Sequence, residues 1–71
     1  MKTKVSIAFG RRVACLRKQL GMTQEEFAFT CGINRTYIGE IERGEKNISL
    51  DCINKIAVGL NIKLKDLFDY E

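Results

Sequence analysis

The chain has 71 residues, of which 45% are hydrophobic and 30% charged, and its formal net charge is +3 at pH 7. This length suits a single domain spanning residues 1–71, and the balance of apolar and charged residues excludes a disordered chain. No apolar run approaches the roughly 20 residues of a membrane span, and the N-terminus lacks the apolar block of a secretory signal. We therefore expect a cytoplasmic protein with no membrane partner.

Positive charge is concentrated at the N-terminal end of the chain. Residues 1–22 have no acidic side chain and contain the basic residues Lys2, Lys4, Arg11, Arg12, Arg17 and Lys18. A basic helix is often only a solvated face, and the alternative is a surface that faces phosphates.

The first helix is predicted from about Ser6 to Leu20, with Gly21 ending it. Its apolar stripe consists of Phe9, Val13, Leu16 and Leu20.

A second helix is predicted to begin at Thr23, because Thr23 and Glu26 have the spacing of a capping box. Gly32 supplies the unrestricted backbone that ends such a helix. Ile33 then places an apolar anchor in the turn, and Asn34 is suited to cap the next helix.

The third helix follows Asn34 directly, and Ile38 and Ile41 face inward at helical spacing. Its outer face is predicted to carry Arg35, Thr36, Gly39 and Glu40. Two short helices joined by a tight turn, over residues 23–44, indicate a helix-turn-helix that reads DNA.

A fourth helix opens at the cap Ser49 with Asp51 in its first turn, and Asn61 ends it. Its inward side chains are predicted to be Leu50, Ile53, Ile56, Ala57 and Leu60. A short fifth helix over Leu64 to Phe68 buries Leu64, Leu67 and Phe68. With no proline and no alternating strand pattern, the chain is predicted to be a compact all-α domain of five helices.

Three segments also carry a family resemblance: M-T-Q-E-E-F-A at 22–28, N-R-T-Y-I-G-E-I-E-R-G at 34–44 and L-N-I-K-L-K-D-L-F at 60–68. From about Phe9 to Phe68 the chain resembles the Xre or phage-repressor type of five-helix, lambda-repressor-like DNA-binding domain. The run at 35–43, followed by Asn47, is especially similar to the controller proteins of restriction-modification systems, which are dimeric transcription regulators.

The resemblance implies that Arg35 and Thr36 read bases, with Glu40 one turn further along the same face. An arginine can bond guanine O6 and N7, a threonine can meet thymine, and a glutamate can accept from cytosine N4. A glutamate near phosphates can equally be solvated or paired with a cation. The positions implied to contact the DNA backbone are Thr23, Gln24, Asn34, Tyr37, Arg43, Lys46 and Asn47. For Tyr37, a half-buried place in the helical seam is an equal alternative.

The resemblance further implies an ion pair between Arg17 and Glu42, which would tie the first helix to the third and hold the recognition helix at its working angle.

The three cysteines, Cys15, Cys31 and Cys52, are widely spaced, and the chain has no histidine. This pattern favours small buried thiols over a metal site or a disulfide framework. With no glycine-rich phosphate loop and no nucleophile beside a base, we expect no enzyme, no cofactor and no small-molecule substrate.

The expected function is therefore sequence-specific regulation of transcription by a homodimer bound to a palindromic operator in double-stranded DNA. The narrower expectation is the controller of a restriction-modification system. An antitoxin or phage-repressor protein that also binds a protein partner is the alternative. Antitoxins of this kind mostly carry an additional toxin-binding segment, whereas three residues follow Phe68 here.

Overall fold

The computed structural model describes residues 2–69, and over this range the chain forms five helices and no strand. The helices are α1 (Lys4–Gln19), α2 (Gln24–Cys31), α3 (Arg35–Glu42), α4 (Leu50–Leu60) and α5 (Leu64–Leu67). The predicted all-α, five-helix fold is thus confirmed, while a single domain over residues 1–71 stays a prediction. Within residues 2–69, no helix combines the length and apolar character needed to cross a membrane.

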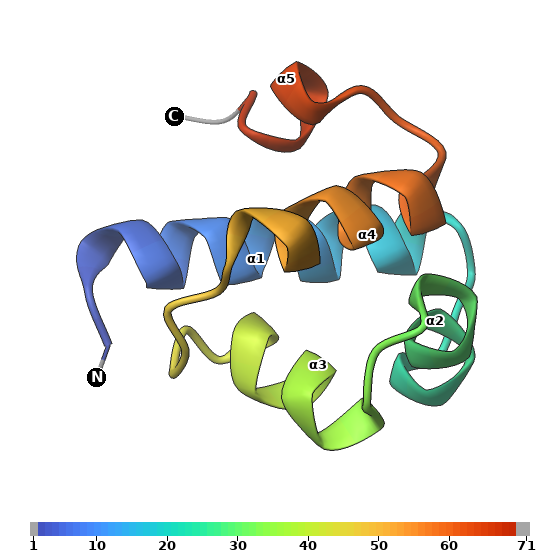
Figure 1. Ribbon diagram of the computed structural model, residues 1–71, viewed down its shortest axis with the longest axis horizontal. Coiled ribbons are helices and arrows are strands. Elements are labelled where there is room, and N and C mark those ends of the chain that lie inside the picture. The colour runs from blue at the N-terminus through green and yellow to red at the C-terminus, as the bar shows by residue number, and fades with distance from the viewer. Residues whose placement is uncertain (1, 70–71) are drawn as a thin grey trace.

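The helices pack so that α3 and α5 lie on opposite edges of the molecule (Figure 1). Helix α1 contacts both α3 and α4, and α2 packs against α3 and α4. Helix α3 therefore rests on α1 and α2 and has one side directed away from the rest of the fold.

Every helix contributes at least one fully buried side chain to a common core. These are Val13 of α1, Phe27 of α2, Ile38 of α3, Ile56 of α4 and Leu67 of α5, each 0% exposed. Because all five helices share this core, a shift of any one of them would disturb the packing that holds α3 in position.

Gly10 sets the distance between α1 and α3. A Cβ atom at this position would lie 2.8 Å from the carbonyl oxygen of Glu42 and closer still to that of Ile41. These are backbone atoms that cannot rotate away, so only glycine permits the two helices to cross this closely.

Helix α1 begins at Lys4, earlier than the predicted start at Ser6. The cap is Thr3, whose amide donates to Ser6 Oγ at 2.8 Å, and the Ser6 amide donates to Thr3 Oγ1 at 3.0 Å. Ser6 is thus the third residue of the helix and forms a reciprocal capping box with Thr3. A serine can serve as the cap or as the third residue, so its presence alone does not locate the helix start.

The predicted burial was wrong at four positions. Leu20, Leu50, Leu64 and Phe68 are 51%, 83%, 47% and 45% exposed. Each stands in a first turn or at a C-cap, where the chain leaves the core and the neighbouring helices leave much of the side chain uncovered. Helical spacing predicts which way a side chain points, but not whether a partner lies there.

Candidate nucleic-acid interface

Both helices of the predicted helix-turn-helix have capped N-termini. The Thr23 amide donates to Glu26 Oε1 at 2.8 Å, and the Glu26 amide donates to Thr23 Oγ1 at 3.1 Å. Gly32 ends α2 in the left-handed conformation with φ of 70°, and Asn34 Oδ1 accepts from the Thr36 amide at 2.8 Å. The local signals of the sequence predicted these boundaries correctly.

Arg35 and Thr36, in the first turn of α3, are both exposed. Their predicted role in base reading stays a prediction. The predicted outer face is wrong for Gly39, which is buried. A Cβ atom there would lie 3.1 Å from Arg43 Nη1 and 3.8 Å from Gln24 Oε1, so the glycine faces the first turn of α2 rather than open solvent.

A carboxylate on α3 joins three helices through one set of hydrogen bonds. Arg17 Nε donates to Glu42 Oε2 at 2.7 Å, and Arg17 Nη2 donates to Glu42 Oε1 at 3.0 Å. Gln24 Nε2 donates to the same Oε1 at 3.0 Å. The side chains of Arg17 and Glu42 are only 9% and 7% exposed, so the implied ion pair is present and nearly buried.

The hydrogen bond that Gln24 donates to Glu42 also orients the Gln24 side chain, which sequence reasoning did not anticipate. A glutamine amide has two N–H donors, and Glu42 uses one of them. The second donor and the α2 N-terminus remain available for a phosphate. Contact between Gln24 and the DNA backbone stays a prediction, and the structure places its side chain in fixed relation to α3.

The C-terminal end of α3 is closed by a turn anchored on α1. The Gly44 amide donates to the Ile41 carbonyl at 3.0 Å and the Glu45 amide to the Glu40 carbonyl at 2.9 Å, the two bonds of a Schellman motif. Gly44 has φ of 76°, and its carbonyl accepts from Ser6 Oγ at 2.9 Å. The loop after α3 thus begins from a fixed position.

Two carboxylates neutralise the two cations of this turn, Arg43 and Lys46, that are predicted to contact the DNA backbone. Arg43 Nε donates to Glu45 Oε2 at 3.0 Å, and Arg43 Nη2 donates to Glu45 Oε1 at 3.2 Å. Lys46 Nζ lies 3.7 Å from Glu40 Oε2. The hydrogen bond from Arg43 holds the pKa of the Glu45 carboxyl below its usual value. Glu45 was not predicted as a site residue, and the left-handed turn at Gly44 brings it beside Arg43. Asn47, next in the loop, is exposed.

Tyr37 occupies the helical seam. It is half-buried and packs against the hydrophobic core. Burial, and next the neighbouring Cys52 thiol of α4, raise the pKa of the Tyr37 phenol. The packing alternative therefore describes this side chain, and a contact with the DNA backbone stays a prediction.

Part of the predicted basic surface is committed elsewhere. Arg12 Nη2 donates to the Asp66 carbonyl at 2.9 Å and so joins α1 to α5, while Arg17 is buried in its pair with Glu42. The remaining cations of residues 1–22 are all exposed: Lys2, Lys4, Arg11 and Lys18.

The cysteines were predicted as buried thiols, but only Cys31 is fully buried. Cys52 is half-buried, and Cys15 is exposed on α1. Burial raises the pKa of the Cys31 thiol to about 11, and nearby Cys52 adds to the effect. In the described part of the chain, no group of three or more His, Cys, Asp or Glu side chains is placed to hold a metal ion.

Comparison with known proteins is consistent with this geometry. Residues 16–67 match the family model described as Helix-turn-helix. The control protein C.BamHI of Bacillus amyloliquefaciens is 44% identical over 71 residues, which cover 99% of this chain and 88% of that protein. The control protein C.MunI of Mycoplasma sp is 42% identical over 65 residues, covering 90% of this chain and 88% of that protein.

A solved structure shows the same fold. The restriction-modification controller protein C.AhdI from Aeromonas hydrophila superimposes with a TM-score of 0.90 at 41% sequence identity. The match covers 93% of this chain and 100% of that one.

Proposed function

This chain belongs to the helix-turn-helix family, and from that premise we propose that it controls transcription as a homodimer on a two-fold-symmetric operator, as the controller protein of a restriction-modification system. Like its relatives, it is a DNA-binding transcriptional regulator. Similarity to two control proteins over nearly the whole chain supports the narrower assignment. A regulator of this kind has no catalytic role and works in the cytoplasm, where its DNA lies.

The observation that carries the proposal is the position of α3 in the fold. This helix lies at one edge of the molecule, is buttressed by α1 and α2, and presents the exposed Arg35 and Thr36 on its first turn. An α-helix fits the major groove, where an arginine can bond guanine bidentately. Arg35 and Thr36 then read bases, with Glu40 as an acceptor for cytosine N4.

The contacts that fix the position of the protein along the duplex are made by residues near α3. The groups proposed to bond phosphates are the amides at the N-termini of α2 and α3 and the second N–H of Gln24. The proposed backbone-contacting residues are Thr23, Gln24, Asn34, Tyr37, Arg43, Lys46 and Asn47. These contacts position the protein without reading sequence.

Dimerisation follows from the need to place two α3 helices on one side of the duplex. The described chain measures 26 × 24 × 21 Å. Two copies joined side by side can therefore place their α3 helices one helical turn of DNA apart, about 34 Å.

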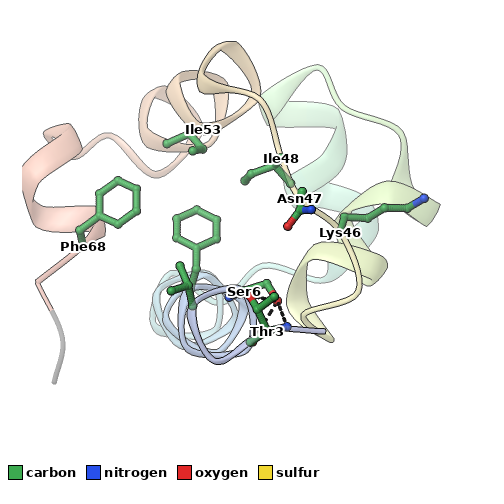
Figure 2. A pocket seen from close by; sticks show the side chains of 9 residues that line it. Thr3, Ser6, Lys46, Asn47, Ile48, Ile53 and Phe68 are labelled. Atoms are coloured by element: carbon green, nitrogen blue, oxygen red, sulfur yellow. Dashed lines mark hydrogen bonds between the residues drawn. The ribbon is translucent and has the colours of Figure 1, made fainter. Parts of the chain in front are cut away.

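An apolar face beside the loop after α3 is the proposed contact with the second copy of the chain. Here a cavity of about 240 Å³ opens between α1, the loop and α4 (Figure 2). Phe68 stacks on Phe9 at its edge with ring centroids 5.3 Å apart, and Val5 on its rim is 72% exposed. Lys46 and Asn47 also line it, so a partner here would lie next to the DNA-facing loop.

Salt dependence tests DNA binding itself. Affinity for duplex DNA should fall with a log–log slope of about −0.9 per phosphate neutralised. Fluorescence anisotropy between low and moderate salt measures this slope. A slope near zero would remove nucleic acid from the proposal.

Base reading is tested after selection of the operator from random DNA. Arg35→Ala should lose roughly 1–3 kcal/mol per half-site and relax discrimination at one position of each half. Gln24→Ala is the matched comparison and should weaken binding to all sequences about equally. Asymmetric selected sites, or unchanged base preference in Arg35→Ala, would refute the assignment.

The subunit contact is tested by sedimentation. Val5→Asp should convert the dimer to monomer, because it places a charge on the apolar face. Phe29→Asp changes a residue that is 90% exposed on α2 and should leave the dimer intact. The opposite result would assign the contact to α2.

A further inference from the structure

The turn after α3 is electrically neutral in the free protein, although it is proposed to contact phosphates. The cations Arg43 and Lys46 are offset by Glu45 and Glu40. A loop that served only to attract DNA would gain from losing both carboxylates, because non-specific affinity comes almost entirely from phosphate attraction. Glu40 already has a proposed role in base reading, but the presence of Glu45 calls for a different one.

The geometry of the Arg43 pair indicates that role. Glu45 accepts from Nε and Nη2 of the guanidinium, and these two bonds fix its plane. The third nitrogen, Nη1, then lies over Gly39, 3.1 Å from where a Cβ atom would stand. From the same point, Gln24 Oε1 is 3.8 Å away, so Arg43 Nη1 and the Gln24 side chain both border the space over Gly39.

The turn itself keeps this arrangement in place. Glu45 is held through its amide, which donates to the Glu40 carbonyl, and Gly44 is fixed to α1 by the bond from Ser6. A pair of exposed side chains is normally mobile, but here one partner starts from a fixed backbone. The absence of a side chain at Gly39 leaves the space that Nη1 occupies.

We propose that Glu45 is a positioning residue that directs the Nη1 edge of Arg43 toward the phosphate bound at Gln24, and so favours DNA bound in the operator register. This inference rests on the proposed function. A phosphate at Gln24 meets Nη1 while the bond to Glu45 remains intact. A phosphate placed elsewhere along the loop must compete with Glu45 for Nε and Nη2, which weakens binding in other registers.

Glu45→Gln tests the proposal, with affinities for the selected operator and for a random-sequence duplex measured at several salt concentrations. The variant should bind random DNA more tightly. Its ratio of operator to random affinity should fall by roughly threefold to fivefold per half-site, the size expected for one exposed ion pair. Asp69→Asn, the charge-matched control, removes an exposed carboxylate two residues after α5 and should leave the ratio unchanged. Helix α5 lies at the opposite edge of the molecule from α3 (Figure 1).

Two further variants separate orientation from simple charge. Gly39→Ala leaves the charge unchanged but fills the space under Nη1, and it should lower the affinity ratio as Glu45→Gln does. In an Arg43→Ala background, Glu45→Gln should no longer change the ratio. Thermal melting of each variant shows that the fold is retained.

The proposal is overturned if Glu45→Gln changes both affinities by the same factor. It is also overturned if Asp69→Asn lowers the ratio equally, or if the effect persists without Arg43. A parent protein with no salt-dependent binding would instead refute the proposed function, and the two failures are therefore distinguishable.

Discussion

Replacing Glu42 with alanine is the most demanding test of how α3 is held. The side chain accepts two hydrogen bonds from Arg17 and one from Gln24, and all three are lost. Arg17 keeps only the bond from Nη1 to the Met22 carbonyl, at 2.6 Å. Its guanidinium is then an almost buried charge without a counter-ion.

The size of the loss follows from burial. Breaking a buried pair by removing one partner costs about 3–5 kcal/mol. Arg17 is 9% exposed along its side chain and retains one carbonyl, so we expect the lower end, about 3 kcal/mol. For a domain of this size each kcal/mol shifts the melting temperature by roughly 4–8 °C, which gives a fall of about 12–24 °C.

Circular dichroism melts and urea titrations of the parent and Glu42→Ala measure this loss, and DNA affinity should fall with it. Glu45→Gln, which removes a solvent-screened carboxylate, should leave the melting temperature almost unchanged. The double variant Arg17→Met, Glu42→Leu should recover much of the loss, because well-packed apolar residues can replace a buried pair. If Glu42→Ala melts within about 2–3 °C of the parent, far less than the expected fall, the pair does not hold α3.

Three other outcomes are expected. Gly10→Ala should destabilise the fold by about 1–3 kcal/mol in urea titration, since its Cβ meets backbone oxygens of α3; an unchanged midpoint would contradict the close crossing. At pH 8 a thiol reagent should label the exposed Cys15 well before Cys31, whose raised pKa of about 11 keeps it protonated, as peptide mass mapping can show. Because the folded pKa of Cys31 lies above the ordinary value of 9.0 for a cysteine thiol, the free energy of unfolding should decline as pH rises from about 9 through 11, and Cys31→Ala should lessen that decline.

Much of the fold was predictable because its signals are local. The cap at Thr23, the left-handed Gly32 and the cap at Asn34 depend on residues within a few positions of one another. Burial at helix ends was not predictable, since the exposure of Leu50 depends on where the other helices stop. Spacing along one helix contains no information about that.

The candidate site was predictable to a smaller extent. The pair of Arg17 and Glu42 was implied by family resemblance, and the structure adds Gln24 as a third member. The role of Glu45 was not visible in the sequence, because it depends on a left-handed turn that folds the chain back beside Arg43. Contacts between residues two apart across such a turn follow no helical periodicity.

The way α3 is fastened also has a consequence for the DNA. Asn34 caps one end of this eight-residue helix, the turn bonded to Ser6 closes the other, and Glu42 is bonded to two further helices. A reading element this rigid cannot adjust its curvature to the groove, so any mismatch in shape has to be absorbed by bending or twisting the duplex. Operators with flexible pyrimidine–purine steps between the half-sites should then be favoured at base pairs that no side chain touches.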